Sequence, residues 1–185
     1  GRDLLTIPDF LRLSQLLYQD QEYLVYRDRR YGFTEFLEWT GRISKGLLGL
    51  GFNRGDRLVV WLSNFPEWLA VWFACQRVGI VPVPVNTRFR KHEISYILSD
   101  SKAKGIVTMG EYLNTDYQAL LAELLPDLAD KDVGEWVSEE FPLLKSVIVV
   151  GDKCLRGALT LQRVEHLGER LDDRYLEAAE DLVRP

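Results

Sequence analysis

The stretch of sequence that decides the fold is Arg57–Val85, RLVVWLSNFPEWLAVWFACQRVGIVPVPV. Its first residues, Arg57–Leu62, are rich in β-branched and aromatic side chains, a composition typical of a β-strand. Near its end Val81, Val83 and Val85 recur at every second position, which indicates another strand. Two strands joined by a helical segment predict a parallel βαβ unit with a right-handed crossover.

The segment between these strands predicts a helix over Glu67–Val78. Ser63 and Asn64 are residue types that cap helix N-termini, and Pro66 is well tolerated in a first turn. Gly79 suits the position just after the helix.

This helix is unusual because residues 68–75, WLAVWFAC, leave almost no polar face. A helix that is apolar all round is expected to be buried on several sides. It is too short to span a bilayer, which takes about 20 apolar residues. We therefore predict a core helix, with Cys75 as a small core residue.

The composition is that of a soluble globular chain: 185 residues, 46% hydrophobic and 28% charged, with a net charge of −5. The negative charge argues against nucleic acid as a partner. Residues 1–110 carry 15 basic and 11 acidic side chains, whereas residues 111–185 carry 8 and 17. The acidic second part favours a solvated helical surface, and a surface that docks a partner is the alternative.

Cysteine and histidine usage points to a reducing setting without a metal site. Cys75 and Cys154 are too few for a disulfide framework, and His92 and His166 show no ligand spacing with them. The sequence contains no signal peptide and no transmembrane span, so the expected location is the cytoplasm.

The rest of the chain alternates strand and helix patterns, which predicts an α/β fold with a mainly parallel sheet flanked by helices. Thr34 is expected to cap the helix that follows it. Expected helices cover Asp3–Gln19, Glu35–Leu50, Lys91–Asp100, Leu113–Leu125, Leu161–Leu171 and Arg174–Val183. Expected strands cover Lys104–Met109, Lys145–Val150 and a hairpin at Glu22–Tyr31, and Pro126–Glu140 is expected to be an acidic surface insertion.

Three places are candidate sites. Residues 63–66, SNFP, open a helix after a strand but lack the glycine that lets phosphate approach closely. Arg27, Arg29 and Arg30 are typical of a charged hairpin tip, with phosphate contact as the alternative. Glu93 and Asp100 share a helix face that they are expected to solvate. No nucleotide-binding loop and no nucleophile elbow occurs, so we assign no catalytic, cofactor-binding or metal-binding residue.

Several local patterns in residues 51–107 resemble one family of enzymes. They are GDR at Gly55–Arg57, SN-x-PE at Ser63–Glu67, the valine- and proline-rich Gly79–Pro84, the NTR-plus-helix pattern at Asn86–Leu98, and the DSKAK that follows. Their order and spacing are similar to the N-terminal region of the AMP-forming adenylating enzymes: acyl-CoA synthetases, luciferases and peptide-synthetase adenylation domains. The resemblance is strong over Tyr31–Met109, loose over residues 1–30, and rests on pattern alone over residues 111–185.

This resemblance implies an enzyme that activates a carboxylic acid with ATP and Mg²⁺ to an acyl-adenylate and passes the acyl group to coenzyme A. Residues 1–185 would be the N-terminal part of the AMP-binding domain, ending before the phosphate loop. This chain alone is therefore expected to bind none of these cofactors and to be inactive. Its expected partners are the remainder of the synthetase and, in the whole protein, a carboxylic acid. The acid would be a fatty acid, with an aryl acid as the alternative. The whole protein would be cytoplasmic or peripherally attached to a membrane.

Two other function classes stay open at this point. One is a non-catalytic α/β scaffold that docks a partner through Trp68 and Trp72. The other is an adenylation domain that serves a carrier protein.

Since the apolar helix between the first two strands leaves no polar face, we also expect exposed apolar surface and self-association as a homodimer.

Overall fold

The computed structural model describes residues 5–184 and divides the chain into two compact units. We call residues 1–55, 64–81 and 165–185 the helical unit, and residues 56–63 and 82–164 the sheet unit. Each unit is described separately below.

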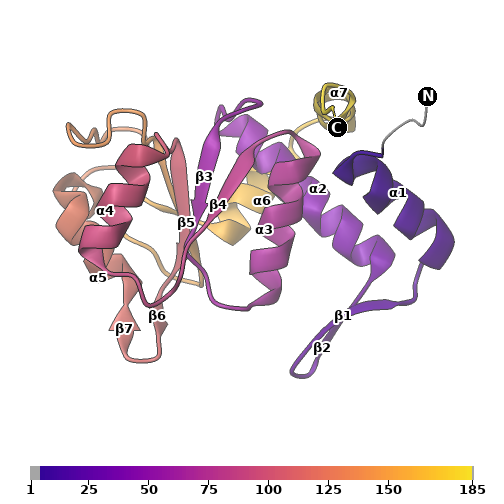
Figure 1. Cartoon of the computed structure of the whole chain (residues 1–185), viewed down its shortest axis with the longest axis horizontal. Helices are drawn as coiled ribbons and strands as arrows, with labels where there is room; N and C mark the ends of the chain where they lie inside the picture. Colours follow the sequence, from indigo (N-terminus) through magenta and orange to yellow (C-terminus); the bar gives the residue numbers. More distant parts are fainter. Residues whose placement is uncertain (1–4, 185) are drawn as a thin grey trace. The chain divides into compact units, whose positions relative to one another are not determined.

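Within residues 5–184, the helical unit contains four helices, the second half of a fifth, and a β-hairpin (Figure 1). These elements span Ile7–Tyr18 (α1), Glu22–Tyr26 (β1), Arg29–Gly32 (β2), Phe33–Gly49 (α2), Pro66–Arg77 (α3), Leu161–Glu169 (α6) and Asp173–Asp181 (α7). Helix α2 packs against α1, α3 and α7, and β1 pairs antiparallel with β2. The hairpin predicted over Glu22–Tyr31 is confirmed.

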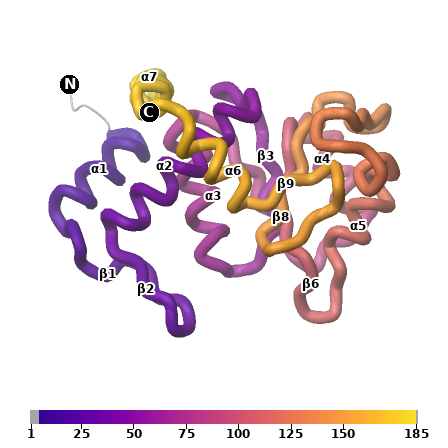
Figure 2. The backbone as a smooth tube through the Cα atoms, turned by 180° about the vertical axis from the view of Figure 1, so that it is seen from behind, coloured from indigo at the N-terminus to yellow at the C-terminus, as the bar shows by residue number. Residues whose placement is uncertain are grey.

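The sheet unit is organised around a five-stranded sheet in the order β4-β3-β5-β8-β9. The strands span Arg57–Val60 (β3), Val81–Pro84 (β4), Gly105–Met109 (β5), Ser146–Val150 (β8) and Leu159–Thr160 (β9). The pairs β3–β5, β5–β8 and β8–β9 are parallel. Figure 2 shows β8 and β9 from behind, with α6 following β9. The predicted α/β class with a mainly parallel sheet is confirmed.

Smaller elements complete the sheet unit. They are α4 (Lys91–Asp100), a short antiparallel hairpin of β6 (Glu111–Tyr112) and β7 (Thr115–Asp116), α5 (Tyr117–Leu124) and a 3₁₀ turn at Pro126–Leu128. Helix α5 packs on β5 and on α4. All five residues of β5 are buried, as expected for a parallel strand that is covered on both faces.

The apolar helix predicted between the first two strands is α3, and no residue in it is exposed. Ala70, Val71, Ala74 and Cys75 are buried, whereas its Trp and Phe side chains are half-buried. Burial raises the pKa of the Cys75 thiol, which is consistent with a core residue. Just after the helix Gly79 adopts a left-handed conformation (φ +71°), as the sequence predicts.

Two capping predictions are wrong. Helix α2 begins at Phe33 with Gly32 as its N-cap, so Thr34 lies inside the first turn, where its hydroxyl donates to the Gln19 carbonyl at 3.2 Å. Helix α3 begins at Pro66 after Phe65, and neither Ser63 nor Asn64 caps it. In both cases the helix begins one or two residues away from the side chain that is best suited to cap it: α2 begins one residue before Thr34, and α3 begins two residues after Asn64.

The predicted helix over Leu113–Leu125 is too long. Residues 111–116 form the β6–β7 hairpin instead, with Leu113 and Asn114 in the left-handed region at φ +46° and +61°. Helix α5 starts only at Tyr117, where the Asp116 carboxylate accepts from the Ala119 amide at 3.0 Å.

The acidic segment Pro126–Glu140 is not only a surface insertion. Most of its residues are exposed, but Leu128 and Trp136 are buried. The Trp136 indole donates to the Gly157 carbonyl at 2.8 Å, and the Gly157 amide donates to the Leu128 carbonyl at 2.8 Å. These two hydrogen bonds, one from a side chain and one between backbone groups, attach the segment to the loop before β9.

None of the helices within residues 5–184 combines the length and the apolar character that crossing a membrane would need.

Candidate functional site

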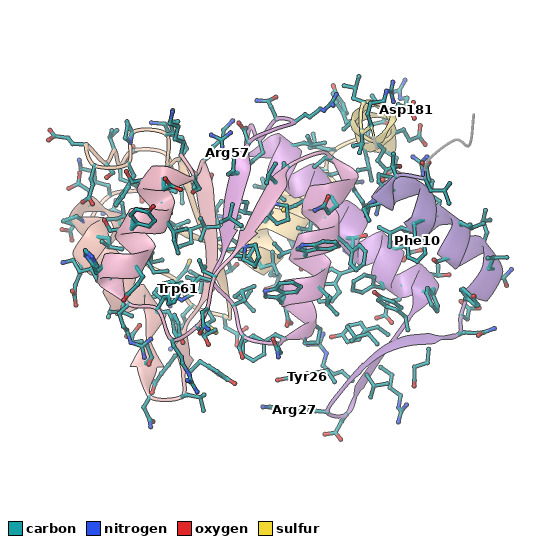
Figure 3. All side chains as sticks on the ribbon, viewed as in Figure 1. Phe10, Tyr26, Arg27, Arg57, Trp61 and Asp181 are labelled. Carbon is teal, nitrogen blue, oxygen red and sulfur yellow. The ribbon has the colours of Figure 1, made fainter. Side chains whose placement is uncertain are left out.

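The carboxyl ends of the parallel strands form the first candidate site, because ligands of open α/β sheets bind there. Trp61 follows β3 and is fully buried; Figure 3 shows it at the opposite end of this strand from Arg57. Its ring meets the Tyr117 ring edge-on, with centroids 4.8 Å apart. The Trp61 indole N–H has no hydrogen-bond partner among the described residues. Two aromatic rings therefore pack against each other where β3 ends.

Tyr117 links this aromatic pair to the connection after β4. Its phenol donates to the Thr87 carbonyl at 3.0 Å, and burial raises its pKa. Arg90, which ends the same connection, donates to the Thr115 hydroxyl at 3.1 Å. Helix α5 and the hairpin β6–β7 thus hold residues 86–90 in place.

The groups described at this edge contribute packing and hydrogen bonding. Trp61 and Tyr117 are aromatic, and the Thr108 hydroxyl donates to the Trp61 carbonyl at 3.3 Å. Arg90 brings a positive charge to the neighbouring connection. These groups can shape and position an apolar or aromatic surface. A nucleophile paired with a base is not among them.

The SNFP segment lies at the start of α3. Its Phe65 ring meets the Tyr26 ring of β1 edge-on, with centroids 6.3 Å apart. Glu93, another of the candidate residues, caps α4: its carboxylate accepts from the Arg90 amide at 2.9 Å. This hydrogen bond lowers the pKa of Glu93. Glu93 therefore has a structural role, and it does not pair with Asp100.

The hairpin arginines are partly neutralised by neighbouring carboxylates. Arg30 pairs with Glu22 across the hairpin, and Arg29 lies 3.6 Å from Glu67. Arg27 stands at the hairpin tip (Figure 3). These contacts favour the interpretation as a charged hairpin tip.

The second candidate is a cleft of about 710 Å³ within the helical unit, lined by residues of α1, α2, α3 and α7. At its base the Arg77 guanidinium donates to the Glu180 carboxylate at 2.5 Å, and these side chains are only 8% and 3% exposed. Arg12 also pairs with Glu180. Burial lowers the pKa of Arg77, and the Glu180 charge opposes that shift.

Every charge at the base of this cleft has a partner. Arg77 also donates to the Leu37 carbonyl at 2.7 Å and the Thr40 hydroxyl at 2.9 Å. Lys45 donates to the Asp173 carboxylate at 2.7 Å. These paired charges join the helices of this unit, and they do not form a nucleophile paired with a base.

No group of three or more metal-ligating side chains occurs within residues 5–184.

Sequence reasoning overlooked the aromatic pair and the Arg77–Glu180 pair. Arg77 gave one usable signal: a lone cation near the end of an otherwise apolar helix needs a buried partner. Nothing in the sequence singled out Glu180 among the acidic residues of the last helix.

The sequence of the chain is similar to proteins of one family. The family described as "AMP-binding enzyme" matches residues 14–156. The chain is 36% identical over 174 residues to "Putative acyl-CoA synthetase YngI" of Bacillus subtilis (strain 168), covering 93% of this chain and 32% of that protein. It is 32% identical over 165 residues to the mitochondrial medium-chain acyl-CoA ligase ACSF2 of Rattus norvegicus, covering 88% and 27%. The chain thus spans about a third of the length of these relatives.

Solved structures show the same fold. The anthranilate CoA ligase AuaEII in complex with anthranoyl-AMP matches with a TM-score of 0.73 at 20% identity, over 88% of this chain and 28% of that one. Coronafacic acid ligase from Pectobacterium brasiliense matches with a TM-score of 0.72 at 17% identity, over 88% and 29%. At these identities the likeness concerns the fold alone.

Proposed function

Because the chain belongs to the AMP-binding enzyme family, we propose that the whole protein is an AMP-forming acid–CoA ligase. The observation that carries this proposal is the 36% identity to an acyl-CoA synthetase over 93% of the chain. The 32% identity to a medium-chain acyl-CoA ligase supports a fatty acid of medium length as the substrate.

The proposed reaction has two steps. A carboxylate oxygen of the acid attacks the α-phosphorus of ATP and expels pyrophosphate, which leaves an acyl-adenylate. The thiol of coenzyme A, as its thiolate, then attacks the acyl carbon, and AMP leaves with the bonding electrons. Mg²⁺ would neutralise the phosphate oxygens during the first step.

In this proposal the present chain contributes scaffold rather than catalytic groups. Its buried ion pairs are satisfied within the chain, and the buried groups described at the carboxyl edge of its sheet are the aromatic side chains of Trp61 and Tyr117. Phosphoryl chemistry depends on positive charge. We therefore expect residues 1–185 alone to be inactive.

Pyrophosphate exchange with ATP tests the proposal, using the whole protein and acids from butyrate to palmitate together with benzoate and anthranilate. We expect exchange that peaks with medium-chain acids and acyl-CoA formation when coenzyme A is added. Faster exchange with benzoate or anthranilate than with the fatty acids would overturn the assignment of a medium-chain fatty acid as the substrate. Exchange without any transfer to coenzyme A would overturn the ligase assignment and favour a carrier protein as acceptor. Exchange by the purified 185-residue chain would overturn its scaffold role.

A further inference from the structure

Helix α7 is attached to the helical unit by very few side chains. Of its nine residues only Leu176 and Glu180 are buried, and both face the cleft. Gly41 of α2 leaves room for them: a Cβ at Gly41 would lie 3.5 Å from a Leu176 methyl carbon and 3.2 Å from the Arg77 guanidinium. A single aliphatic side chain therefore supplies the buried apolar contact of α7.

The remaining attachments of α7 are charged and lie at its two ends. At the N-terminal end the Lys45 ammonium donates to the Asp173 carboxylate at 2.7 Å and to the Leu171 carbonyl at 3.1 Å. At the C-terminal end Glu180 pairs with Arg77 of α3 and Arg12 of α1. Asp181, the last residue of α7, is labelled in Figure 3 and marks this end of the helix.

Among the cations that α7 would leave behind, Arg77 keeps two uncharged hydrogen-bond partners. Arg77 retains its hydrogen bonds to the Leu37 carbonyl and to the Thr40 hydroxyl, and water could enter once the cleft opened. The Arg12 side chain is already 44% exposed. Arg77 and Lys45 would lose their carboxylate partners, but both would become hydrated as the cleft opens, so neither would stay buried and unpaired, which is the usual large penalty of breaking a buried ion pair. A helix of nine residues is also too short to persist alone in water, so α7 would unfold as it leaves.

We propose that α7 is a releasable strap, held by charge, whose local unfolding opens the cleft and uncovers the cationic face formed by Arg12, Lys45 and Arg77. This inference goes beyond the proposed ligase function and does not depend on it. It predicts an opening of α7 that is separate from global unfolding.

Hydrogen exchange followed by mass spectrometry tests the strap in the chain itself. In the unmodified chain, amides of residues 173–182 should exchange at least tenfold faster than the central amides of α2. Low concentrations of urea should leave the α7 rate nearly unchanged, because a local opening exposes little surface. Equal protection of α7 and α2, with equal urea dependence, would overturn the proposal.

Two variants with the same change in net charge sharpen the test. Glu180→Gln should speed exchange in α7 a further tenfold or more and leave α2 within twofold of the unmodified chain. Glu177→Gln alters an exposed residue that lines the same cleft, and it should change neither helix by more than twofold. Loss of protection in α2 together with α7 would show that α7 is an integral part of the fold. Equal effects of the two variants would show that the Glu180 ion pairs do not hold α7.

Discussion

Gly168 of α6 lies directly against the Arg42 carbonyl of α2: a Cβ built on Gly168 would stand 1.9 Å from that oxygen and 2.8 Å from the Gly46 amide nitrogen. Both neighbouring atoms belong to the backbone of α2, so no side-chain rotation can relieve the contact. The close approach of these two helices therefore requires glycine at this position.

The first prediction is that Gly168→Ala destabilises the chain, although alanine is the better helix former by about 1 kcal/mol. Overpacking typically costs 1–3 kcal/mol, and this backbone clash should cost about 3 kcal/mol or more. Urea unfolding followed by circular dichroism measures the change. Gly49→Ala is the control, since its Cβ would meet only a Leu171 methyl carbon at 3.3 Å. A loss of stability no larger than that of the control would contradict the helix contact.

The second prediction concerns Glu165, whose carboxylate accepts from the Trp39 indole at 2.9 Å. Burial raises the pKa of Glu165 above its ordinary value of 4.5, so the folded chain binds this proton more tightly than the unfolded chain does. The stability that results is fully present below the unfolded pKa and is lost as the pH rises through the raised folded pKa.

Glu165→Gln removes this titration and keeps an oxygen that can accept from Trp39. The free energy of unfolding of the variant, relative to the unmodified chain, should therefore increase as the pH is raised from 4 to 7. Urea titrations at matched pH values measure it. Glu169→Gln removes the same charge from a half-exposed side chain next to Arg42, which controls for the change in net charge. A difference that stays flat across this range, or matches that control, would refute the prediction.

The sequence predicted those elements whose pattern is local and long. Lys91–Asp100 is a helix with the predicted bounds. The strand–helix–strand unit at Arg57–Val85 was predictable because its apolar run, its early proline and its closing glycine all indicate the same structure. Two-residue elements such as Leu159–Thr160 are too short to show a period, and Leu113 gives no sign that it adopts the left-handed region.

The candidate sites were less predictable because they depend on distant pairs. Arg77 and Glu180 are separated by 103 positions, and Trp61 meets a tyrosine that the sequence placed in mid-helix rather than at a helix start. A local pattern can indicate that Arg77 needs a partner, but the fold alone decides which carboxylate supplies it.

The third prediction tests the aromatic pair at the carboxyl edge of the sheet. Tyr117→Phe keeps the ring against Trp61 but removes the hydrogen bond to the Thr87 carbonyl, which should cost about 1 kcal/mol. Tyr117→Ala also removes the buried ring and should cost about 3–5 kcal/mol. Urea unfolding of both variants measures the difference. Similar losses for the two variants would mean that the ring contributes little packing.

The last prediction concerns self-association. The sequence suggested that α3 would present apolar surface, yet no α3 residue is exposed. A group of exposed apolar side chains lies on α1 instead: Phe10, Leu13, Leu16 and Leu17 are 54%, 43%, 69% and 62% exposed. At helical spacing these four share one side of α1, opposite the buried Leu11.

We propose that this face of α1 pairs two copies of the chain, since contiguous exposed apolar surface favours association and two-fold dimers are the commonest closed assembly. Sedimentation equilibrium from 1 to 100 μM should show a concentration-dependent dimer. Leu13→Glu combined with Leu17→Glu should shift the equilibrium to monomer by at least tenfold in dissociation constant, because two charges would be buried in the contact. Val137→Glu is the control, since it adds a charge at an apolar side chain that is 63% exposed but lies in the sheet unit. An unmodified chain that stays monomeric at 100 μM, or a dimer that persists in the double variant, would exclude α1 as the contact.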